Sequence, residues 1–254
     1  MDVIVIQCDM KKTREELIKV YEDTEHYIEG HKMEFKSSTK HYGIAINETP
    51  IITVIDSDTV SAIIKYRQYG RLCVLNMASA KRAGGGVKKG EPTQEECLFR
   101  CSNLSHTING DSYPLGDFDF IYTKNAVFFK DADYNEMRHI EADVITMPAI
   151  NLNRNSYFDK EKNEWVDGIV EKPPQYDHII KQKMRAMFST AIENKVQTLI
   201  LGAWGCGVFK NHPLDIAYAF RDVLVTEGYG YHFDDIIFAV INDENSTGNN
   251  YYYF

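Results

Sequence analysis

Apolar residues recur along this chain at two spacings, one helical and one typical of buried strands. The first clear helical pattern covers residues 13–30. Its apolar or partly apolar positions are Leu17, Tyr21, Thr24 and Ile28. Thr13 and Glu16 have the spacing of a capping box, and Gly30 is a candidate C-terminal stop. This segment is therefore predicted to form a helix.

Short, continuously apolar runs predict buried strands farther along the chain. The expected strands are residues 51–55, 72–75, 126–129, 144–147, 196–201 and 236–241. The other expected helices run from the candidate N-caps Ser57 and Asp58 to about Tyr69, from about Gln94, from 176 to 194, and from 213 to about 227. Residues 151–174 are charged and irregular, which favours a long surface loop or insertion.

Strands and helices alternate through most of the chain, which favours an α/β fold with a largely parallel sheet covered on both faces. A chain of 254 residues can form one large core, so residues 1–254 are interpreted as a single domain. Within it, about residues 1–40 form an N-terminal helical extension. The polar, tyrosine-rich residues 242–254 are expected to be a loosely held tail.

The net charge of −9 argues against a nucleic-acid-binding protein, which needs a basic surface, and so against sequence-specific recognition. A phosphate-bearing ligand would have to be attracted mainly by backbone amides and helix N-termini. No apolar stretch is long enough to span a membrane, and no signal peptide is recognisable. We expect a soluble, cytoplasmic protein without membrane partners.

The cysteines form no CxxC pair or regular framework, which suits reduced thiols. They are Cys8, Cys73, Cys97, Cys101 and Cys206. Cys97 and Cys101 could share a helix face, but without nearby histidines they make a poor zinc site and are interpreted as core residues. No metal site and no cofactor is predicted.

A first candidate site lies in the stretch LNMASAKRAGGGVKKGEPTQEECLFR, which begins in a predicted strand. The glycines 84–86 permit close backbone approach to a ligand at the strand's C-terminal end. Gln94, Glu95 and Glu96 follow. Thr93 and Glu96 also have the spacing of a capping box, so a purely structural role for Glu96 remains open. Adjacent helical carboxylates point about 100° apart, which favours different tasks over a symmetric acid pair.

A second candidate site lies in LILGAWGCGVFKNHPLDIAYAF, which reads as a strand, a glycine-rich loop and a helix. Its glycines could present backbone N–H groups to a phosphate, although a plain tight turn is the alternative. It lacks the lysine of a P-loop and the spacing of a dinucleotide fingerprint. A nucleophile elbow at Cys206 needs glycine two residues earlier, where Trp204 stands, so a reactive thiol is disfavoured.

The GGG and QEE motifs, with LNMASAKRAGGG around the first, resemble the microbial-type poly(ADP-ribose) glycohydrolases. The similarity includes GAWGCGVF, NAVFFKD and DVITMPAIN and covers roughly residues 40–242. The resemblance implies a macrodomain-like, three-layer α/β/α fold with a mixed, mainly parallel sheet. It also implies that the protein hydrolyses ribose–ribose bonds of poly(ADP-ribose) or acts on ADP-ribosylated macromolecules, with ADP-ribose as the product.

The same resemblance implies roles for individual residues. Glu96 would protonate the leaving oxygen and then activate water, while Glu95 would orient the distal ribose. Asn76 stands where the family places a ribose-contacting residue, whereas Ser79 departs from the usual Asn. The remaining substrate-binding residues would be Gly84, Gly85, Gly86, Gln94, Gly205, Cys206, Gly207, Val208 and Phe209.

Two other functions compete with this hypothesis. One is a macrodomain that binds ADP-ribose without cleaving it, and the other is a hydrolase that removes single ADP-ribose groups from protein or nucleic acid. The presence of both Glu95 and Glu96 favours an enzyme, because a binding module would need neither carboxylate.

Overall fold

The computed structural model describes residues 12–31, 50–108, 110–153, 157–159, 164–166, 171–242 and 249–254. Its main sheet has six strands in the order β1-β8-β7-β2-β4-β3. They are β1 (Ile51–Asp56), β2 (Leu72–Met77), β3 (Ile121–Lys130), β4 (Glu136–Met147), β7 (Thr198–Leu201) and β8 (Asp235–Val240). All neighbouring pairs are parallel except β3 with β4, which is antiparallel. The sheet is therefore mixed and mainly parallel, as predicted.

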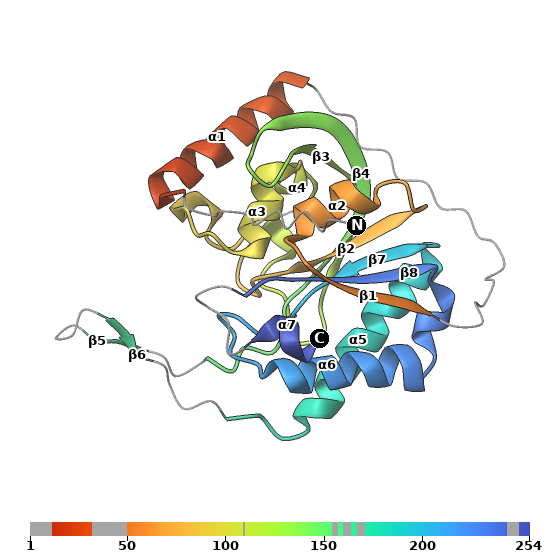
Figure 1. The fold of residues 1–254 in the computed structure, drawn as a ribbon. Coiled ribbons are helices and arrows are strands. Elements are labelled where there is room, and N and C mark those ends of the chain that lie inside the picture. Colours follow the sequence, from red (N-terminus) through yellow and green to blue (C-terminus); the bar gives the residue numbers. More distant parts are fainter. Residues whose placement is uncertain are drawn as a thin grey trace.

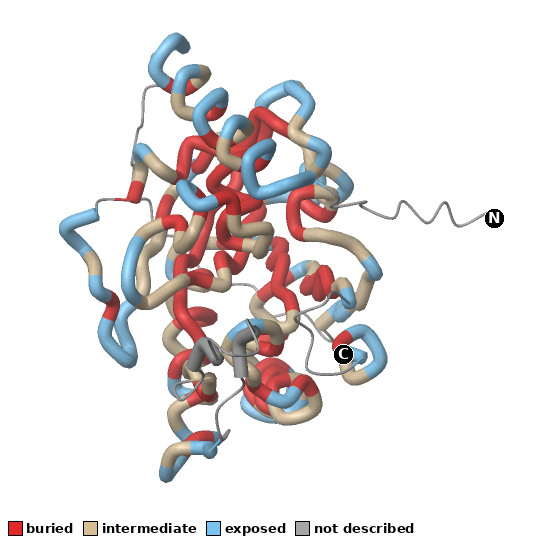
Figure 2. The backbone as a smooth tube through the Cα atoms, turned by 90° about the vertical axis from the view of Figure 1, so that its left-hand side faces the viewer, coloured by how far each residue is buried: buried red, intermediate tan, exposed pale blue. Residues whose placement is uncertain are grey.

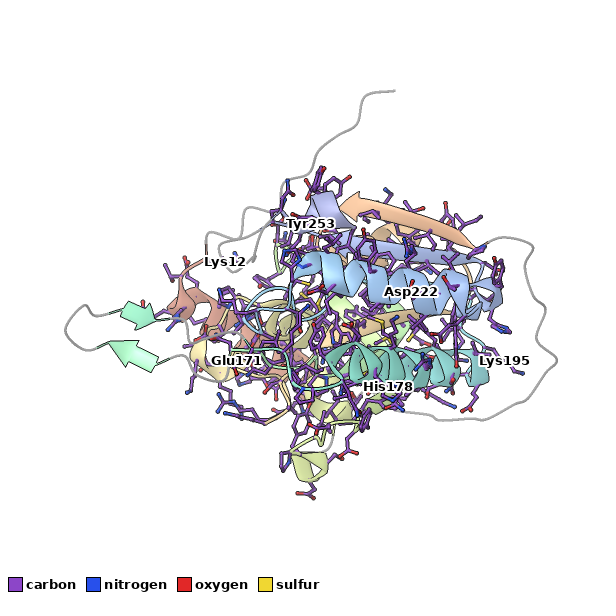
Figure 3. All side chains as sticks on the ribbon, turned by 90° about the horizontal axis from the view of Figure 1, so that it is seen from below. Lys12, Glu171, His178, Lys195, Asp222 and Tyr253 are labelled. Carbon is purple, nitrogen blue, oxygen red and sulfur yellow. The ribbon has the colours of Figure 1, made fainter. Side chains whose placement is uncertain are left out.

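Helices cover both faces of this sheet (Figure 1). On one face lie α1 (Arg14–His31), α2 (Thr59–Tyr66), α3 (Gln94–Cys101) and α4 (Leu104–Thr107). On the other face lie α5 (Tyr176–Glu193) and α6 (Pro213–Arg221). Figure 3 shows these two helices side by side, and its labels His178 and Asp222 mark this face. The three-layer α/β/α architecture is confirmed.

The two faces of the sheet have separate apolar cores because successive strand residues point to opposite sides. In β2, Cys73 and Leu75 pack into the core beneath α5 and α6, whereas Leu72 and Val74 pack into the core beneath α2 and α3. Figure 2 shows the buried backbone running through the centre, with the exposed turns outside. This double burial explains the continuously apolar strands in the sequence.

Several local predictions are confirmed. In α1, the Glu16 carboxylate accepts a hydrogen bond from the Thr13 N–H (2.7 Å), and the Glu16 N–H donates to the Thr13 hydroxyl (3.3 Å), which completes the capping box. The buried residues of α1 are Leu17, Tyr21, Thr24 and Ile28. Gly30 does not end this helix, which continues to His31. Asp58 caps α2 by accepting from the Ser61 N–H at 2.9 Å.

Other predictions were wrong in their details. The helix α2 ends at Tyr66 instead of Tyr69, and the last part of the predicted 213–227 helix is a π-helix over Asp222–Thr226. The stretch 151–174 contains the antiparallel strands β5 (Tyr157–Asp159) and β6 (Glu164–Val166). No apolar pattern in the sequence indicates these two paired strands.

The end of the predicted loose tail is ordered. Residues 243–248 lie outside the described part of the chain, but α7 (Asn250–Tyr253) follows them. The ring of Phe254 lies 5.3 Å from that of Phe238 and 6.2 Å from that of Phe220, centroid to centroid. The tail therefore packs on the core formed by β8 and α6.

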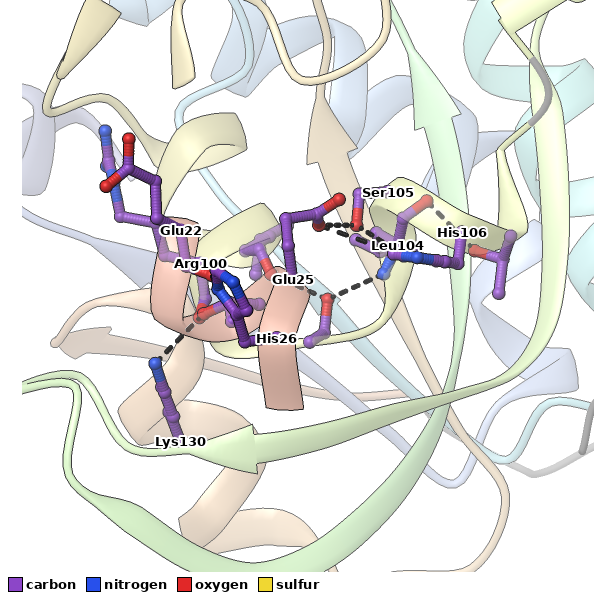
Figure 4. A network of polar contacts seen from close by, with 12 residues as sticks. Glu22, Glu25, His26, Arg100, Leu104, Ser105, His106 and Lys130 are labelled. Atoms are coloured by element: carbon purple, nitrogen blue, oxygen red, sulfur yellow. Dashed lines mark hydrogen bonds and ion pairs between the residues drawn. The ribbon is translucent and has the colours of Figure 1, made fainter. Parts of the chain in front are cut away.

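The helix α1 is attached to the core by buried polar groups as well as apolar ones (Figure 4). Arg100, which is fully buried in α3, donates to the carbonyls of Leu17 (3.0 Å) and Glu91 (2.6 Å). The Lys130 ammonium donates to the Thr24 hydroxyl at 3.1 Å, and this hydroxyl contacts the Arg100 carbonyl. These contacts connect the N-terminal helix directly to the helix that carries the two glutamates.

We expect Arg100→Met to lower the free energy of unfolding by about 2–4 kcal/mol, because the buried Arg100 loses two charge-assisted hydrogen bonds to backbone carbonyls. Urea unfolding followed by circular dichroism measures this change. Amide hydrogen exchange should show the loss of protection concentrated in α1. The exposed Arg138→Met is the control. Equal stability of the two variants would contradict the anchoring role of Arg100.

Candidate active site

The helix α3 is an unusually buried platform for charged residues. Seven of its eight residues are buried, including Glu95 and Glu96, which are 3% and 5% exposed. Gln94 fixes the start of this helix against β2. Its amide donates to the carbonyl of Leu75 (2.7 Å), and its oxygen accepts from the N–H of Met77 (2.9 Å). Gln94 thus sets the position of the two carboxylates that follow it.

Backbone N–H groups hold the Glu95 carboxylate. One oxygen accepts from the N–H of Ser79 at 2.7 Å, and the other accepts from the N–H of Gly84 at 3.2 Å. Both donors belong to the loop that follows β2. The carboxylate therefore ties this loop to the first turn of α3.

The Glu96 carboxylate is held by the same loop. One oxygen accepts from the N–H of Gly86 at 2.7 Å, and the other contacts the Thr93 hydroxyl. Thr93 occupies the N-cap position of α3, but its side chain accepts no capping hydrogen bond. The capping-box alternative for Thr93 and Glu96 is therefore wrong: the hydroxyl that would have capped the helix contacts the carboxylate instead.

The three predicted loop glycines differ in what they contact. A Cβ on Gly84 would lie 2.6 Å from the Phe99 ring, and one on Gly86 would lie 2.3 Å from the Glu91 side chain. A Cβ on Gly85 would lie 2.4 Å from a Glu96 oxygen and 2.9 Å from a Glu95 oxygen, and its φ is +53°. Side chains larger than hydrogen are thus excluded at Gly85 by both carboxylates and by the backbone conformation.

A second loop, between β7 and α6, is held from beneath. The indole of Trp204 donates to the Met147 carbonyl at 3.0 Å. The amide of Asn211 donates to the carbonyls of Ile150 (2.8 Å) and Gly205 (2.9 Å). Gly205 has a φ of +76°, and a Cβ there would lie 2.5 Å from Asn211. These contacts fix the loop without using the N–H groups of Gly205, Gly207 and Val208.

The predicted phosphate-binding residues of this second loop divide into two kinds. Among the described residues, the backbone N–H groups of Gly205, Gly207, Val208 and Phe209 donate to no other group of the chain. The Cys206 N–H instead donates to the Ala203 carbonyl at 3.0 Å, and its side chain is fully buried. Burial raises the pKa of the Cys206 thiol far above its ordinary value. Cys206 is thus placed to pack beneath the loop.

Both loops border one cleft of about 450 Å³, a volume in the range of small-molecule sites. Gly85, Gly86 and Gln94 to Glu96 line one part of it, and Gly205 with Gly207 to Phe209 line another. The cleft lies at the carboxyl ends of the parallel strands, where ligands of open α/β sheets bind. The two glycine loops therefore meet at one edge of the sheet.

Three of the predicted residues do not line this cleft: Asn76, Gly84 and Cys206. Asn76 is fully buried at the end of β2, where its amide donates to the Thr146 hydroxyl at 3.2 Å and also to Glu95. It therefore lies behind the carboxylate. Gly84 is covered by the Phe99 ring.

Sequence reasoning missed several cleft residues. Asp58, interpreted as a helix cap, also lines the cleft, as do Arg82, Glu91 and Asn250. The position of Asp58 directly after a strand could have indicated it, because the carboxyl ends of parallel strands meet at one edge. Asn250 could not have been found, since the chain must first fold for residues near its end to reach this edge. No cluster of metal-ligating side chains occurs among the described residues.

Burial raises the pKa of Glu95 to about 8. The negative charge of Glu96 contributes to this rise in the pKa, whereas hydrogen bonds from the Ser79 N–H, Asn76 and the Gly84 N–H oppose it. The carboxyl group of Glu95 therefore holds a proton at neutral pH in the folded protein.

Comparison with known proteins matches this site to a family. Residues 6–131, about half of the chain, match the family model described as the microbial-type PARG catalytic domain. This region contains the first glycine loop and both glutamates. The chain belongs to the microbial-type PARG family. No curated protein sequence matches the chain.

Solved structures of other PARG proteins share the fold. Poly(ADP-ribose) glycohydrolase from Thermomonospora curvata, bound to the inhibitor ADP-HPD, is 21% identical over 94% of this chain and 98% of that one, with a TM-score of 0.74. The enzyme from Deinococcus radiodurans, bound to ADP-ribose, is 25% identical over 95% and 88% of the two chains, with a TM-score of 0.63. The fold of this PARG family member is thus macrodomain-like. No described helix is long and apolar enough to cross a membrane.

We expect Gly85→Ala to inactivate this PARG family member without unfolding it. The new Cβ must displace the carboxylates of Glu95 and Glu96 and also strains a positive φ, at a cost of about 1–2 kcal/mol. Activity and thermal unfolding should be compared with Gly110→Ala, whose Cβ meets nothing within 4 Å. An active Gly85→Ala protein would show that the carboxylates need not stay where the loop holds them.

The raised pKa of Glu95 predicts a pH-dependent stability. Between its ordinary value of 4.5 and about 8, the folded state keeps a proton that the unfolded chain has released. The free energy of unfolding should therefore fall as pH rises through this window, by at most about 1.4 kcal/mol per pH unit from this group. Thermal unfolding from pH 5 to 9 should show a smaller decline for Glu95→Gln than for the wild type.

The comparison uses the slope and not the absolute stability. Both oxygens of Glu95 accept N–H groups, so the amide of glutamine must lose one of these contacts. Exposed Glu171→Gln is the control and should keep the wild-type slope. A Glu95→Gln protein with an unchanged slope would contradict a raised pKa at this residue.

Proposed function

We propose that this protein hydrolyses the ribose–ribose O-glycosidic bonds of poly(ADP-ribose) and releases ADP-ribose. The observation that carries the proposal is the pair of buried glutamates held by the first glycine loop in a cleft that a second glycine loop also borders. Membership of the PARG family supports it, as do the ligands ADP-HPD and ADP-ribose bound to its structural relatives.

In this proposal the second loop binds the diphosphate of the terminal ADP-ribose unit. Gly205, Gly207 and Val208 line the cleft, and their N–H groups donate to no other group among the described residues, which suits an anionic ligand. Phe209 lines the same wall and can pack on the nucleotide. The buried Cys206 supports the turn from beneath, because its thiol and N–H both face the protein. Binding the diphosphate fixes the ribose relative to Glu96.

Glu96 is the proposed general acid and base. Cleavage of the glycosidic bond builds oxocarbenium character on the ribose, and the departing oxygen needs a proton. The Thr93 hydroxyl touches one Glu96 oxygen, and a hydroxyl can accept from the protonated acid or donate to the carboxylate. The same contact therefore suits both halves of the reaction. After the leaving group departs, the Glu96 carboxylate takes a proton from the attacking water.

Glu95 is proposed to position the ribose. Its raised pKa keeps the carboxyl group neutral, so that it can donate a hydrogen bond to a ribose hydroxyl as well as accept one. A neutral Glu95 also avoids placing two negative charges side by side in a buried site once Glu96 has given its proton to the leaving oxygen. Asn76 and the N–H groups of Ser79 and Gly84 hold the Glu95 side chain in place.

The reducing cytoplasm remains the predicted location.

Glu96→Gln tests the mechanism. Glutamine can keep both contacts, because its oxygen can accept from the Gly86 N–H while its amide donates to the Thr93 hydroxyl. Stability should therefore stay within about 0.5 kcal/mol of the wild type. Release of ADP-ribose from the polymer should fall at least about 10²-fold, with little change in ADP-ribose affinity.

Calorimetric titration with ADP-ribose and thermal unfolding are the controls for this variant. A stable, fully active Glu96→Gln protein would overturn the assignment of Glu96. Assays on polymer and on mono-ADP-ribosylated protein separate the alternatives. Cleavage of the mono-modified substrate alone would indicate a mono-ADP-ribosyl hydrolase, and tight binding without any cleavage would indicate a binding module.

A further inference from the structure

Four basic side chains surround the first glycine loop. They are Lys81, Arg82, Lys88 and Lys89. The segment 81–90 that carries them is called the basic loop. Residues 81–90 contain no acidic residue, although the whole chain carries a net charge of −9. All four side chains are exposed, and within the described part of the chain none of them forms an ion pair. The neighbouring Glu91 is paired with Arg14 at 3.2 Å.

The basic loop lies beside the proposed acid. Arg82 and Lys89 line the cleft. The Arg82 guanidinium donates from Nε to the Gly85 carbonyl at 2.7 Å, and the next residue, Gly86, holds the Glu96 carboxylate. These cations therefore belong to the loop that holds the Glu96 carboxylate, whereas the proposed diphosphate site of the terminal unit lies on the loop between β7 and α6.

We propose that the basic loop binds the diphosphate of the leaving side of the substrate, that is, the next ADP-ribose unit of the polymer beyond the scissile bond. This inference rests on the proposed function. The terminal unit's own diphosphate is served by the N–H groups of the second loop, so the cations are left for a different anion. In a polymer, the chain continues past Glu96 with another diphosphate, and exposed cations attract such a group over several ångströms.

A local group of cations also suits this protein because its net charge of −9 otherwise repels a polyanion such as the polymer. Each cation–phosphate contact displaces a counterion, so affinity for the polymer should depend steeply on salt. Free ADP-ribose fills only the terminal site and lacks the second diphosphate. The basic loop should therefore distinguish polymer from the ADP-ribose product, which favours product release.

The test uses binding in the Glu96→Gln background, so that the substrate survives. Lys88→Gln with Lys89→Gln is the main variant, because within the described part of the chain neither lysine side chain forms a hydrogen bond, and the backbone bond from the Lys89 N–H to the Gly86 carbonyl is kept. Polymer affinity at low salt should fall about 3- to 20-fold, and the slope of log K against log salt should decrease by about 1.4. ADP-ribose affinity, measured by calorimetry, should stay within about twofold.

Two further variants complete the design. Arg82→Gln should act in the same direction as the lysine pair. Lys65→Gln with Arg138→Gln removes the same charge near the end of α2 and the start of β4, away from the cleft, and should change polymer affinity less than about twofold. An equal loss of polymer affinity in this control would show that only the net charge of the protein matters, and it would overturn the inference.

Unchanged polymer affinity in the Lys88 and Lys89 variant would also overturn the inference, as would an equal loss of ADP-ribose affinity, which would place these cations at the terminal unit. The proposed function is tested separately by release of ADP-ribose from polymer with the unsubstituted chain. If the unsubstituted chain is active and the Lys88 and Lys89 variant binds polymer as tightly as before, the basic loop does not bind substrate, while the proposed hydrolase function stands.

Discussion

The hydrogen bonds from the loop after β2 to Glu95 and Glu96 determine the geometry of this site. Two carboxylates in one buried helical turn would repel each other and lose their hydration. The N–H groups of Ser79, Gly84 and Gly86 replace water for both of them. In return the carboxylates fix the three consecutive glycines of this loop, Gly84 to Gly86. The burial of α3 and the anchoring of α1 by Arg100 both keep this helix in register with the loop.

The two glycine-rich loops use their backbone N–H groups in opposite ways. The first directs N–H groups at the protein's own carboxylates, whereas the second keeps those of Gly205, Gly207 and Val208 available on the cleft wall. This difference comes from the side chains beneath each loop. Trp204 and Asn211 hold the second loop from behind. An acidic protein can in this way offer an anion site through backbone N–H groups.

Much of the fold could be predicted from the sequence, because apolar runs reveal strands that are buried on both faces. The capping box of α1 was also predictable, since its two hydrogen bonds join Thr13 and Glu16, which are only three residues apart. Thr93 and Glu96 have the same spacing, yet the nearby Gly86 N–H binds the Glu96 carboxylate and the local motif does not form. Likewise the aromatic contacts of Phe254 join distant segments and leave no periodic signal. Local patterns fail where a distant backbone supplies the partner.

The sequence motif GGG is explained by three separate contacts. Gly84 admits the Phe99 ring, Gly86 admits the Glu91 side chain, and Gly85 admits both carboxylates. Only the requirement at Gly85 comes directly from the charged site, while those at Gly84 and Gly86 arise from packing around it. The sequence pattern and the family resemblance both placed all three glycines against the ligand. The structure indicates a different order of causes, in which the glycines first allow α3 to approach the loop, and the approach then creates the acidic wall that a ribose would meet.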